Sequence, residues 1–321
     1  MIGNLLAAVL IVIAALPARA ADIPDRPMTL VIPFPPGGST GYTARVLAGE
    51  LEKIVKQPVK VEPKTGNFGI NAIREIIGKT DGTTLMVGSI ITNSMTPVMH
   101  RGEIDFDYDR EVVAITKLAT FPSVLMTRPS NPASTVADAL AQLKSGSGQL
   151  RFGSDFPGTY VDVDFIMLGK VADLKVSIRS ANGAIAILND LVDGKIDMAM
   201  LNVATASANV GKFKPLAVTG PARLANFPDV PTMAEAGFAQ IGTSNWQGLF
   251  AARGTPTELV RTLHKAAIEA MSTATARQEI AKVDAAVVTS ETPEKLAAEI
   301  KAEMATWERL VPQVMSLPKD N

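Results

Sequence analysis

The sequence predicts an α/β protein of two domains, built from strands and helices that alternate along the chain. Short β-branched or apolar runs are separated by amphipathic stretches, and this pattern is typical of helices packed on largely parallel sheets. About 300 residues follow the apolar N-terminal segment, a length that favours two domains over one. The chain has no Cys, which excludes disulfides and thiolate metal sites. A chain of this length can bury a core without such cross-links.

The individual elements follow from apolar periodicity and from turn residues between the runs. We expect strands at 28–32, 59–62, 84–87, 112–118, 123–127, 150–153, 174–178, 196–201, 215–219 and 248–252. Helices are expected after Ser39, with Ala44, Leu47, Leu51 and Ile54 on one face, and at 70–78, 136–144, 160–172 and 184–193. Two further helices, opened by Thr255-Pro256 and by Thr292-Pro293, run to 271 and to about 310 and tie the chain's end to an earlier domain. Residues 316–321 are expected to fray.

Residues 33–40, Pro-Phe-Pro-Pro-Gly-Gly-Ser-Thr, join the first strand to the first helix. The prolines keep the backbone extended, Gly37 and Gly38 permit a close approach, and Ser39 or Thr40 is placed to cap the helix. The first N–H groups and the positive dipole end of the helix then face whatever rests on the glycines. This turn therefore predicts a seat for a carboxylate or phosphate, with a ligand-free strand-to-helix turn as the alternative.

Two later turns repeat this arrangement. Residues 153–159, Gly-Ser-Asp-Phe-Pro-Gly-Thr, lie between a strand and a helix, and Gly88, Ser89 and Thr92 also follow a strand. If the first two turns belong to different domains, a small acid is held in the cleft between them.

The N-terminus reads as a secretory signal over residues 1–20. An apolar core at 5–16 precedes Ala18-Arg19-Ala20 and a predicted cleavage before Ala21. The usual basic n-region is missing, and an uncleaved anchor is the alternative. The apolar run is shorter than the roughly 20 residues that span a bilayer, which favours a removed signal and an exported protein.

The charge balance and the remaining motifs exclude several classes of function. The chain carries 31 Lys and Arg against 32 Asp and Glu, and it has neither a basic tail nor a basic run with aromatics, so no nucleic-acid partner is expected. Residues 105–109, Asp-Phe-Asp-Tyr-Asp, lack the glycine and distant Glu of an EF-hand. We expect a solvated acidic turn there, and no metal or cofactor.

A serine hydrolase is a remote alternative. Gly37-Gly-Ser-Thr-Gly41 matches the nucleophile-elbow string, with Ser39 as the nucleophile. The elbow requires a sharp turn directly off the strand, whereas here a proline-rich segment separates the strand from Gly37. The only candidate bases are His100 and His264, neither in a catalytic context. The sequence therefore predicts that the protein is not an enzyme.

Several motifs in order along the mature chain resemble those of the Bug-type solute receptors of tripartite tricarboxylate transporters. The resemblance rests on residues 33–40, Gly66, Asn67, Gly69, Asp81, Gly82, Leu85, Asp229, Val230, Pro231, Thr232, Glu235, Ala236, Gly237, Trp246, Gly248, Leu249, Gly254, Thr255 and Pro256. Its separate motifs at compatible spacing make it more specific than any single glycine string.

The resemblance implies a periplasmic receptor of two α/β domains with type II-like periplasmic-binding-protein (Venus flytrap) architecture, joined by crossing strands around a ligand cleft. Domain 1 comprises residues 23–121 and 246–321, and domain 2 comprises 122–245. The implied partners are a small carboxylate and the membrane permease subunits of a tripartite transporter, and the receptor itself is a monomer. It closes on its ligand without making or breaking a bond. A ligand sensor that feeds a signalling partner is the alternative.

The predicted ligand-binding residues lie on these turns and at positions that border the family's cleft. They are Phe34, Pro36, Gly37, Gly38, Ser39, Thr40, Tyr42, Ser89, Thr92, Gly153, Ser154, Phe156, Gly158, Thr159, Asn182, Gly183 and Asn202.

Departures from the family pattern bear on the ligand. Gly41 stands where the family often has an Asp, which disfavours an amino acid. The second turn carries Phe156 and Tyr160 in place of small residues, and Asn182 replaces a Lys. Added aromatic faces beside a lost cation predict a bulkier carboxylate, such as an aromatic acid.

Overall fold

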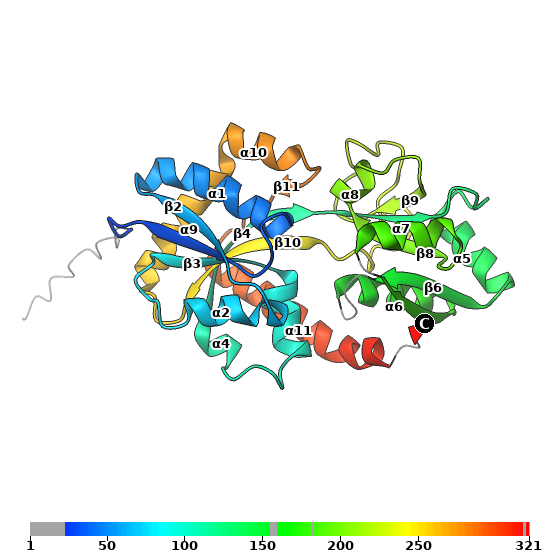
Figure 1. Cartoon of the computed structure of the whole chain (residues 1–321), viewed down its shortest axis with the longest axis horizontal. Helices are drawn as coiled ribbons and strands as arrows, with labels where there is room; N and C mark the ends of the chain where they lie inside the picture. The colour runs from blue at the N-terminus through cyan, green and yellow to red at the C-terminus, as the bar shows by residue number, and fades with distance from the viewer. Residues whose placement is uncertain (1–22, 155–158, 182, 317–318, 321) are drawn as a thin grey trace, which may run out of the picture.

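The chain forms two lobes, each built on a six-stranded mixed sheet with helices on both faces (Figure 1). The computed structural model describes residues 23–154, 159–181, 183–316 and 319–320. The predicted signal segment, Phe156, Gly158 and Asn182 lie outside these residues. The first sheet has the strand order β11-β4-β10-β3-β1-β2, and the second has the order β12-β7-β6-β8-β5-β9. The predicted α/β fold is confirmed.

The first lobe comes from both ends of the described chain. Its N-terminal elements are β1 (Met28–Ile32), α1 (Ser39–Val55), β2 (Val59–Pro63), η1 (Asn67–Gly69), α2 (Ile70–Ile76), β3 (Thr84–Ser89), the π-helix η2 (Ile91–Met95), α3 (Thr96–Met99), α4 (Tyr108–Glu111) and β4 (Val112–Phe121). Its C-terminal elements are β10 (Asn245–Ala252), α9 (Thr257–Ser272), α10 (Ala274–Ala281), β11 (Ala286–Val287) and α11 (Pro293–Met315).

The second lobe is continuous apart from its last strand. It comprises β5 (Ser123–Thr127), α5 (Val136–Ser145), β6 (Gln149–Ser154), α6 (Tyr160–Ala172), β7 (Lys175–Ser180), α7 (Ala184–Val192), β8 (Met198–Asn202), α8 (Val203–Ser207), β9 (Lys214–Val218) and β12 (Lys319–Asp320).

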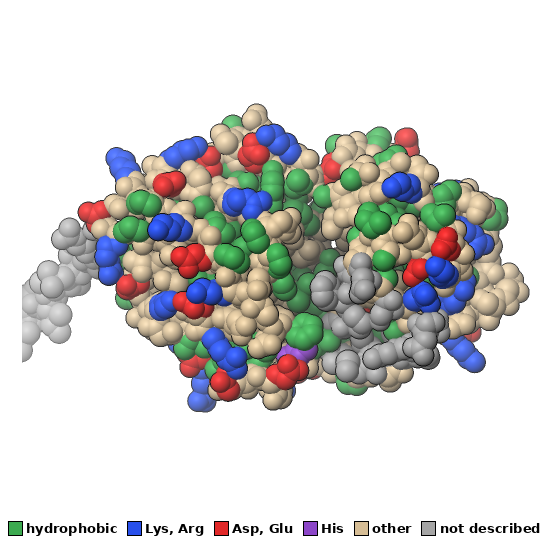
Figure 2. Space-filling view, viewed as in Figure 1, with side chains coloured by type: hydrophobic (Ala, Val, Ile, Leu, Met, Phe, Trp, Pro, Cys, Tyr) green, Lys and Arg blue, Asp and Glu red, His purple; other side chains and the backbone are tan. Residues whose placement is uncertain are grey.

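The strand register places one edge of each sheet beside the strands that cross between the lobes. The parallel strands β1, β2 and β3 end on the side where Ser89 pairs with Gln247, near the start of the crossing strand β10. In the second lobe, the end of β8 lies at the start of β5, where Asn202 pairs with Ser123, and β6 runs parallel to β8. The carboxyl edges of both sets of parallel strands therefore meet at the crossing strands, and Figure 2 shows a hollow between the lobes there. Ligands of open α/β sheets commonly bind at such edges.

Four clusters of buried apolar side chains pack the helices against the two sheets. In the first lobe, α1 and α9 cover one face of the sheet, and α2 and α11 cover the other. In the second lobe, α5 and α6 pack on one face and α7 and α8 on the other. Helix α11 also bridges the lobes, since its Trp307 shares a buried cluster with Tyr160 and Val163 of α6. This contact joins the two lobes in addition to the crossing strands.

Three expectations about the elements were wrong. The sheets are mixed, because β4, β5, β9, β10 and β11 run antiparallel to neighbours. Helix α9 starts at Thr257 after Pro256, since the Thr255 hydroxyl donates to the Ala252 carbonyl (2.8 Å) instead of capping the helix. The expected frayed end contains a strand, in which Lys319 pairs with Ile178 of β7.

Candidate functional site

The N-terminus of α1 forms an uncapped turn at the cleft edge of the first lobe. Gly38 is the N-cap residue, with φ −84° and ψ 178°, and no side chain of the described residues caps it, so the prediction that Ser39 or Thr40 caps the helix was wrong. The first bond within the helix joins the Tyr42 N–H to the Gly38 carbonyl (2.9 Å). The N–H groups of Ser39, Thr40 and Gly41 precede it and have no intrahelical acceptor. The first turn contains no acidic residue, so its positive dipole end is not neutralised from within.

The shape of this turn depends on Gly41 more than on the two preceding glycines. A Cβ on Gly41 would lie 2.4 Å from the Pro36 carbonyl oxygen, whereas one on Gly37 or Gly38 would meet no atom closer than 3.9 Å. Only glycine at position 41 lets the proline segment pack against the helix. The Arg45 guanidinium also donates to the Pro36 carbonyl (2.5 Å) and braces the same segment. The tight backbone contact in this turn thus lies at Gly41, and not at Gly37 or Gly38.

Gln247 connects this seat to the crossing strand β10. Thr40 Oγ1 donates to Gln247 Oε1 (2.7 Å), and Gln247 Nε2 donates to Ser39 Oγ (3.3 Å) and Asn245 Oδ1 (3.1 Å). The Gln247 side chain is completely buried, and both seat hydroxyls are engaged by it. Sequence reasoning missed this residue, although a Gln inside an otherwise apolar strand next to Trp246 was a usable signal.

The second predicted seat lies between β6 and α6. Thr159 is the N-cap of α6, and its N–H donates to the Asp162 carboxylate (3.2 Å) in a capping box. An acid in the first turn already balances the helix dipole there, so the second seat is less open to an anion than the first. Ser154 Oγ at the end of β6 is buried and has no hydrogen-bond partner within the described residues. A ligand oxygen or a water satisfies hydroxyls of this kind.

Other predicted residues border the same edges. Ser89 is buried, and its Oγ lies 3.5 Å from the Thr92 N–H. Thr92 Oγ1 is buried and has no partner within the described chain. Gly183 is the N-cap of α7 with φ 87°, a conformation that favours glycine. Asn202 caps α8 by accepting from the Thr205 N–H (2.9 Å).

Four other predicted residues take part in packing or in the turn before α1. Gly153 admits the side chains of Ile187 and Ile196, which a Cβ would meet at about 3 Å. The Tyr42 hydroxyl donates to the Glu279 carbonyl (2.9 Å), which directs this side chain toward α10. Phe34 is half-buried at the start of the proline segment, where Pro36 is exposed.

Tyr160, which was expected near the ligand, lies in the core, and so does Trp246 of β10. Tyr160 is 6% exposed and packs between α6 and α11. Trp246 is 3% exposed, and its indole N–H donates to the Glu303 carboxylate (3.0 Å). Burial raises the pKa of Glu303, while the hydrogen bonds from Ser94 and Trp246 and the charge of Lys117 oppose the shift. Neither ring offers a face to the cleft.

Asp164 ties α6 to the segment that leads from the second lobe into β10. Its carboxylate accepts from the Thr243 N–H (2.9 Å) and the Thr243 hydroxyl (2.9 Å), just before β10 begins. Burial raises the pKa of Asp164 to about 6, against the lowering effect of these hydrogen bonds. Nothing in the sequence pattern singled this residue out.

The raised pKa of Asp164 predicts a pH-dependent stability. Between the unfolded pKa of 3.8 and the folded pKa of about 6, the folded protein holds the proton more tightly than the unfolded chain. Protonation of Asp164 therefore stabilises the folded protein. The contribution of the protonated carboxyl to the free energy of unfolding is fully present below about pH 4, falls as the pH rises to about 6 and is lost above it. In urea unfolding between pH 4 and 7, the free energy of unfolding of the unaltered protein should include this decrease with rising pH, and that of Asp164→Asn should not. Parallel pH profiles for the two proteins would contradict the assignment.

The residues of the hydrolase alternative, Ser39, His100 and His264, make hydrogen bonds to other groups of the described residues. His100 Nδ1 pairs with Glu103 (2.9 Å) and His264 Nε2 with the Ser290 carbonyl (3.0 Å), while Ser39 Oγ accepts from Gln247. No cluster of three or more potential metal ligands occurs in the part of the chain that the structure covers. In the acidic turn, Asp105 pairs with Arg74 and Asp107 caps α4.

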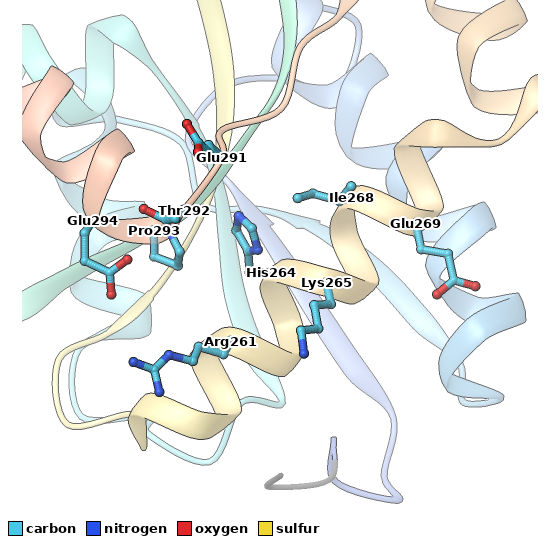
Figure 3. Close-up of a pocket in the computed structure, with 9 residues that line it drawn as sticks. All are labelled: Arg261, His264, Lys265, Ile268, Glu269, Glu291, Thr292, Pro293 and Glu294. Carbon is cyan, nitrogen blue, oxygen red and sulfur yellow. The ribbon is translucent and has the colours of Figure 1, made fainter.

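A separate pocket of about 640 Å³ lies between α9 and the start of α11. Figure 3 shows that its lining comes from these two elements and the segment that joins β11 to α11, all within the first lobe. Charged side chains line much of it, including Arg261, Lys265 and Glu294. It lacks the paired helix N-termini that border the hollow between the lobes. None of the helices within the described residues is long and apolar enough to cross a membrane.

Two α/β lobes that turn their carboxyl edges toward each other across crossing strands form the architecture that was expected of a solute-binding receptor. Residues 43–315 match the profile of the tripartite tricarboxylate transporter family receptor, TctC. The chain belongs to this family, and the predicted Bug-type receptor is confirmed. It is a receptor and not an enzyme.

Curated relatives and solved structures are similar to this protein over nearly the whole chain. The protein is 32% identical over 311 residues to a UPF0065 protein from the gbd 5′ region of Cupriavidus necator, covering 93% of this chain and 92% of the relative. It is 27% identical to protein BugT of Bordetella pertussis, covering 92% of each chain. The structure of MatC from Rhodopseudomonas palustris with bound malate is 27% identical, with a TM-score of 0.71, covering 90% of this chain and 99% of that one. A TctC solute-binding protein from Polaromonas is 25% identical with a TM-score of 0.77, covering 90% and 99%.

Proposed function

We propose that this protein captures a small organic carboxylate between its lobes and delivers it to the permease subunits of a tripartite transporter. The observation that carries the proposal is the N-terminus of α1, which lies at the cleft edge with open N–H groups and no acid of its own. A carboxylate accepts hydrogen bonds from such groups and is stabilised by the helix dipole. The similar MatC structure contains malate, a small carboxylate.

The two seats have unequal roles in this mechanism. The ligand's acid group binds first to the turn before α1, because Asp162 already balances the N-terminus of α6. The second lobe then closes over the ligand, with Ser154, Thr159 and Gly183 at its edge. Since the ligand contacts both lobes only in the closed form, it shifts the population toward that form.

The ligand is proposed to be a plain acid, with a bulky or aromatic remainder. An acidic side chain at position 41 would clash with Pro36, because a Cβ there already lies 2.4 Å from the Pro36 carbonyl oxygen. The first seat therefore has no acidic partner at position 41 for an amino group. Residues 1–20 are proposed to be a cleaved signal, which sends the receptor to the periplasm as a monomer.

Native mass spectrometry of the freshly purified protein, followed by calorimetric titration, tests the proposal. We expect a co-purifying or added carboxylate to bind with a stoichiometry of one, and the corresponding amide to bind at least about tenfold more weakly, since charge-assisted bonds are stronger than neutral ones. Equal binding of the acid and its amide, or no binding by any acid in a broad panel, would contradict it. Binding without transport when the permease is present would favour the sensor alternative.

A further inference from the structure

The loop between β2 and α2 holds Phe68 in an unusual conformation. Phe68 has φ 52° and ψ 28°, in the left-handed region, and it follows Asn67 with φ 47°. Bulky residues rarely adopt this conformation because it brings Cβ close to the following carbonyl. The Phe68 side chain is nevertheless 45% exposed, so burial of the ring does not account for its place.

Side chains from neighbouring segments fix the loop at the cleft edge. Thr96 Oγ1 donates to the Phe68 carbonyl (2.9 Å), and the Asn71 amide donates to the Thr65 carbonyl (2.9 Å). A Cβ on Gly69 would lie 2.7 Å from the Thr92 side chain and 3.1 Å from that of Pro33. The loop therefore packs on the segments that follow β1 and β3, at the same carboxyl edge as the seat before α1.

His100 covers one face of the Phe68 ring. The two ring centroids are 3.9 Å apart with an interplanar angle of 19°, and His100 Nδ1 is held by Glu103 at 2.9 Å. The other exposed large apolar side chains of the described residues are aliphatic. Phe68 thus presents a partly exposed aromatic ring on the loop that packs at this edge of the first sheet, whereas Tyr160 is buried.

We propose that the uncovered part of the Phe68 ring binds the aromatic or apolar remainder of the ligand whose carboxylate rests on the N-terminus of α1. This inference rests on the proposed function and names the residue that selects among acids. An aromatic ligand gains stacking and apolar burial on this ring, whereas a small hydroxy acid does not reach it. The strained backbone is retained because it places the ring there.

Calorimetric titration of Phe68→Gly with phenylacetate and with malate tests the proposal. Glycine adopts positive φ readily, so the variant should melt at a higher temperature than the unaltered protein. Its affinity for phenylacetate should fall about tenfold, because stacking and apolar contact are lost, with malate affinity unchanged. Val210→Ala, which shortens an exposed side chain (66%) of the second lobe, is the matched control and should alter neither affinity.

The outcomes separate this inference from the proposed function. Binding of malate but not of phenylacetate by the unaltered protein would overturn the role of Phe68 and leave the carboxylate receptor intact. Equal phenylacetate affinity in Phe68→Gly would overturn it too. If neither these acids nor a broad panel of other carboxylates bind, both the proposed function and this inference fail.

Discussion

Replacing Gly38 by Asp is expected to reduce carboxylate affinity roughly 100-fold without loss of stability. The N-cap backbone is already extended, with φ −84° and ψ 178°, and a Cβ there has 3.9 Å to its nearest neighbour. An Asp in this position accepts the first-turn N–H groups itself and stabilises the helix. The ligand then loses charge-assisted bonds of about 1.5–3 kcal/mol each and meets a like charge.

Two variants at the same position serve as controls, measured by calorimetry and thermal unfolding. Gly38→Asn caps the helix without the charge and should lose less affinity than Gly38→Asp. Gly38→Ala neither caps nor crowds the seat and should bind almost as the unaltered protein does. Retained affinity in Gly38→Asp, with the melting temperature unchanged or raised, would show that the ligand does not use the N-terminus of α1.

Replacing Gln247 by Leu is expected to weaken both folding and binding. The change leaves the buried Thr40 hydroxyl without its acceptor, which costs about 1–3 kcal/mol of stability. It also removes the link between the crossing strand and the seat, so we expect affinity to fall about tenfold as α1 loses its fixed orientation. Urea unfolding and titration with the same carboxylate measure the two effects.

A double-mutant cycle with Thr40→Val isolates this contact. When both polar partners become apolar groups of similar shape, the desolvation penalty disappears. The double variant should therefore be more stable than Gln247→Leu alone, with an interaction energy of about 1 kcal/mol or more between the sites. Simple additivity of the two single effects would mean that the hydrogen bond contributes nothing to the fold.

Much of the fold follows from local pattern. The strand 28–32 and the helix 160–172 have the expected bounds. The strand is an apolar run bounded by turn residues, and the helix is an apolar run that follows an N-cap residue. Both signals are local in the sequence. The antiparallel insertion of β10 between β3 and β4 joins residues more than 100 positions apart, and no local signal specifies that pairing. The two-residue strands β11 and β12 are too short for periodicity to reveal.

The candidate site was predictable in its backbone and less so in its side chains. The turn before α1 follows from Pro and Gly chemistry, but the steric role of Gly41 depends on how Pro36 folds back. Gln247 and Asp164 act through partners far away in sequence, so their roles follow only from the tertiary structure. Phe68 carries no sequence signal of its left-handed backbone, because neighbouring segments impose that conformation.

A crystal structure with the tightest-binding acid tests most directly whether the N-terminus of α1 holds the ligand. We expect one carboxylate oxygen within about 2.7–3.2 Å of the Thr40 or Gly41 nitrogen, and the rest of the ligand enclosed by both lobes. A ligand in the pocket beside α9, or one whose acid group contacts only side chains while the start of α1 stays solvated, would contradict the assignment.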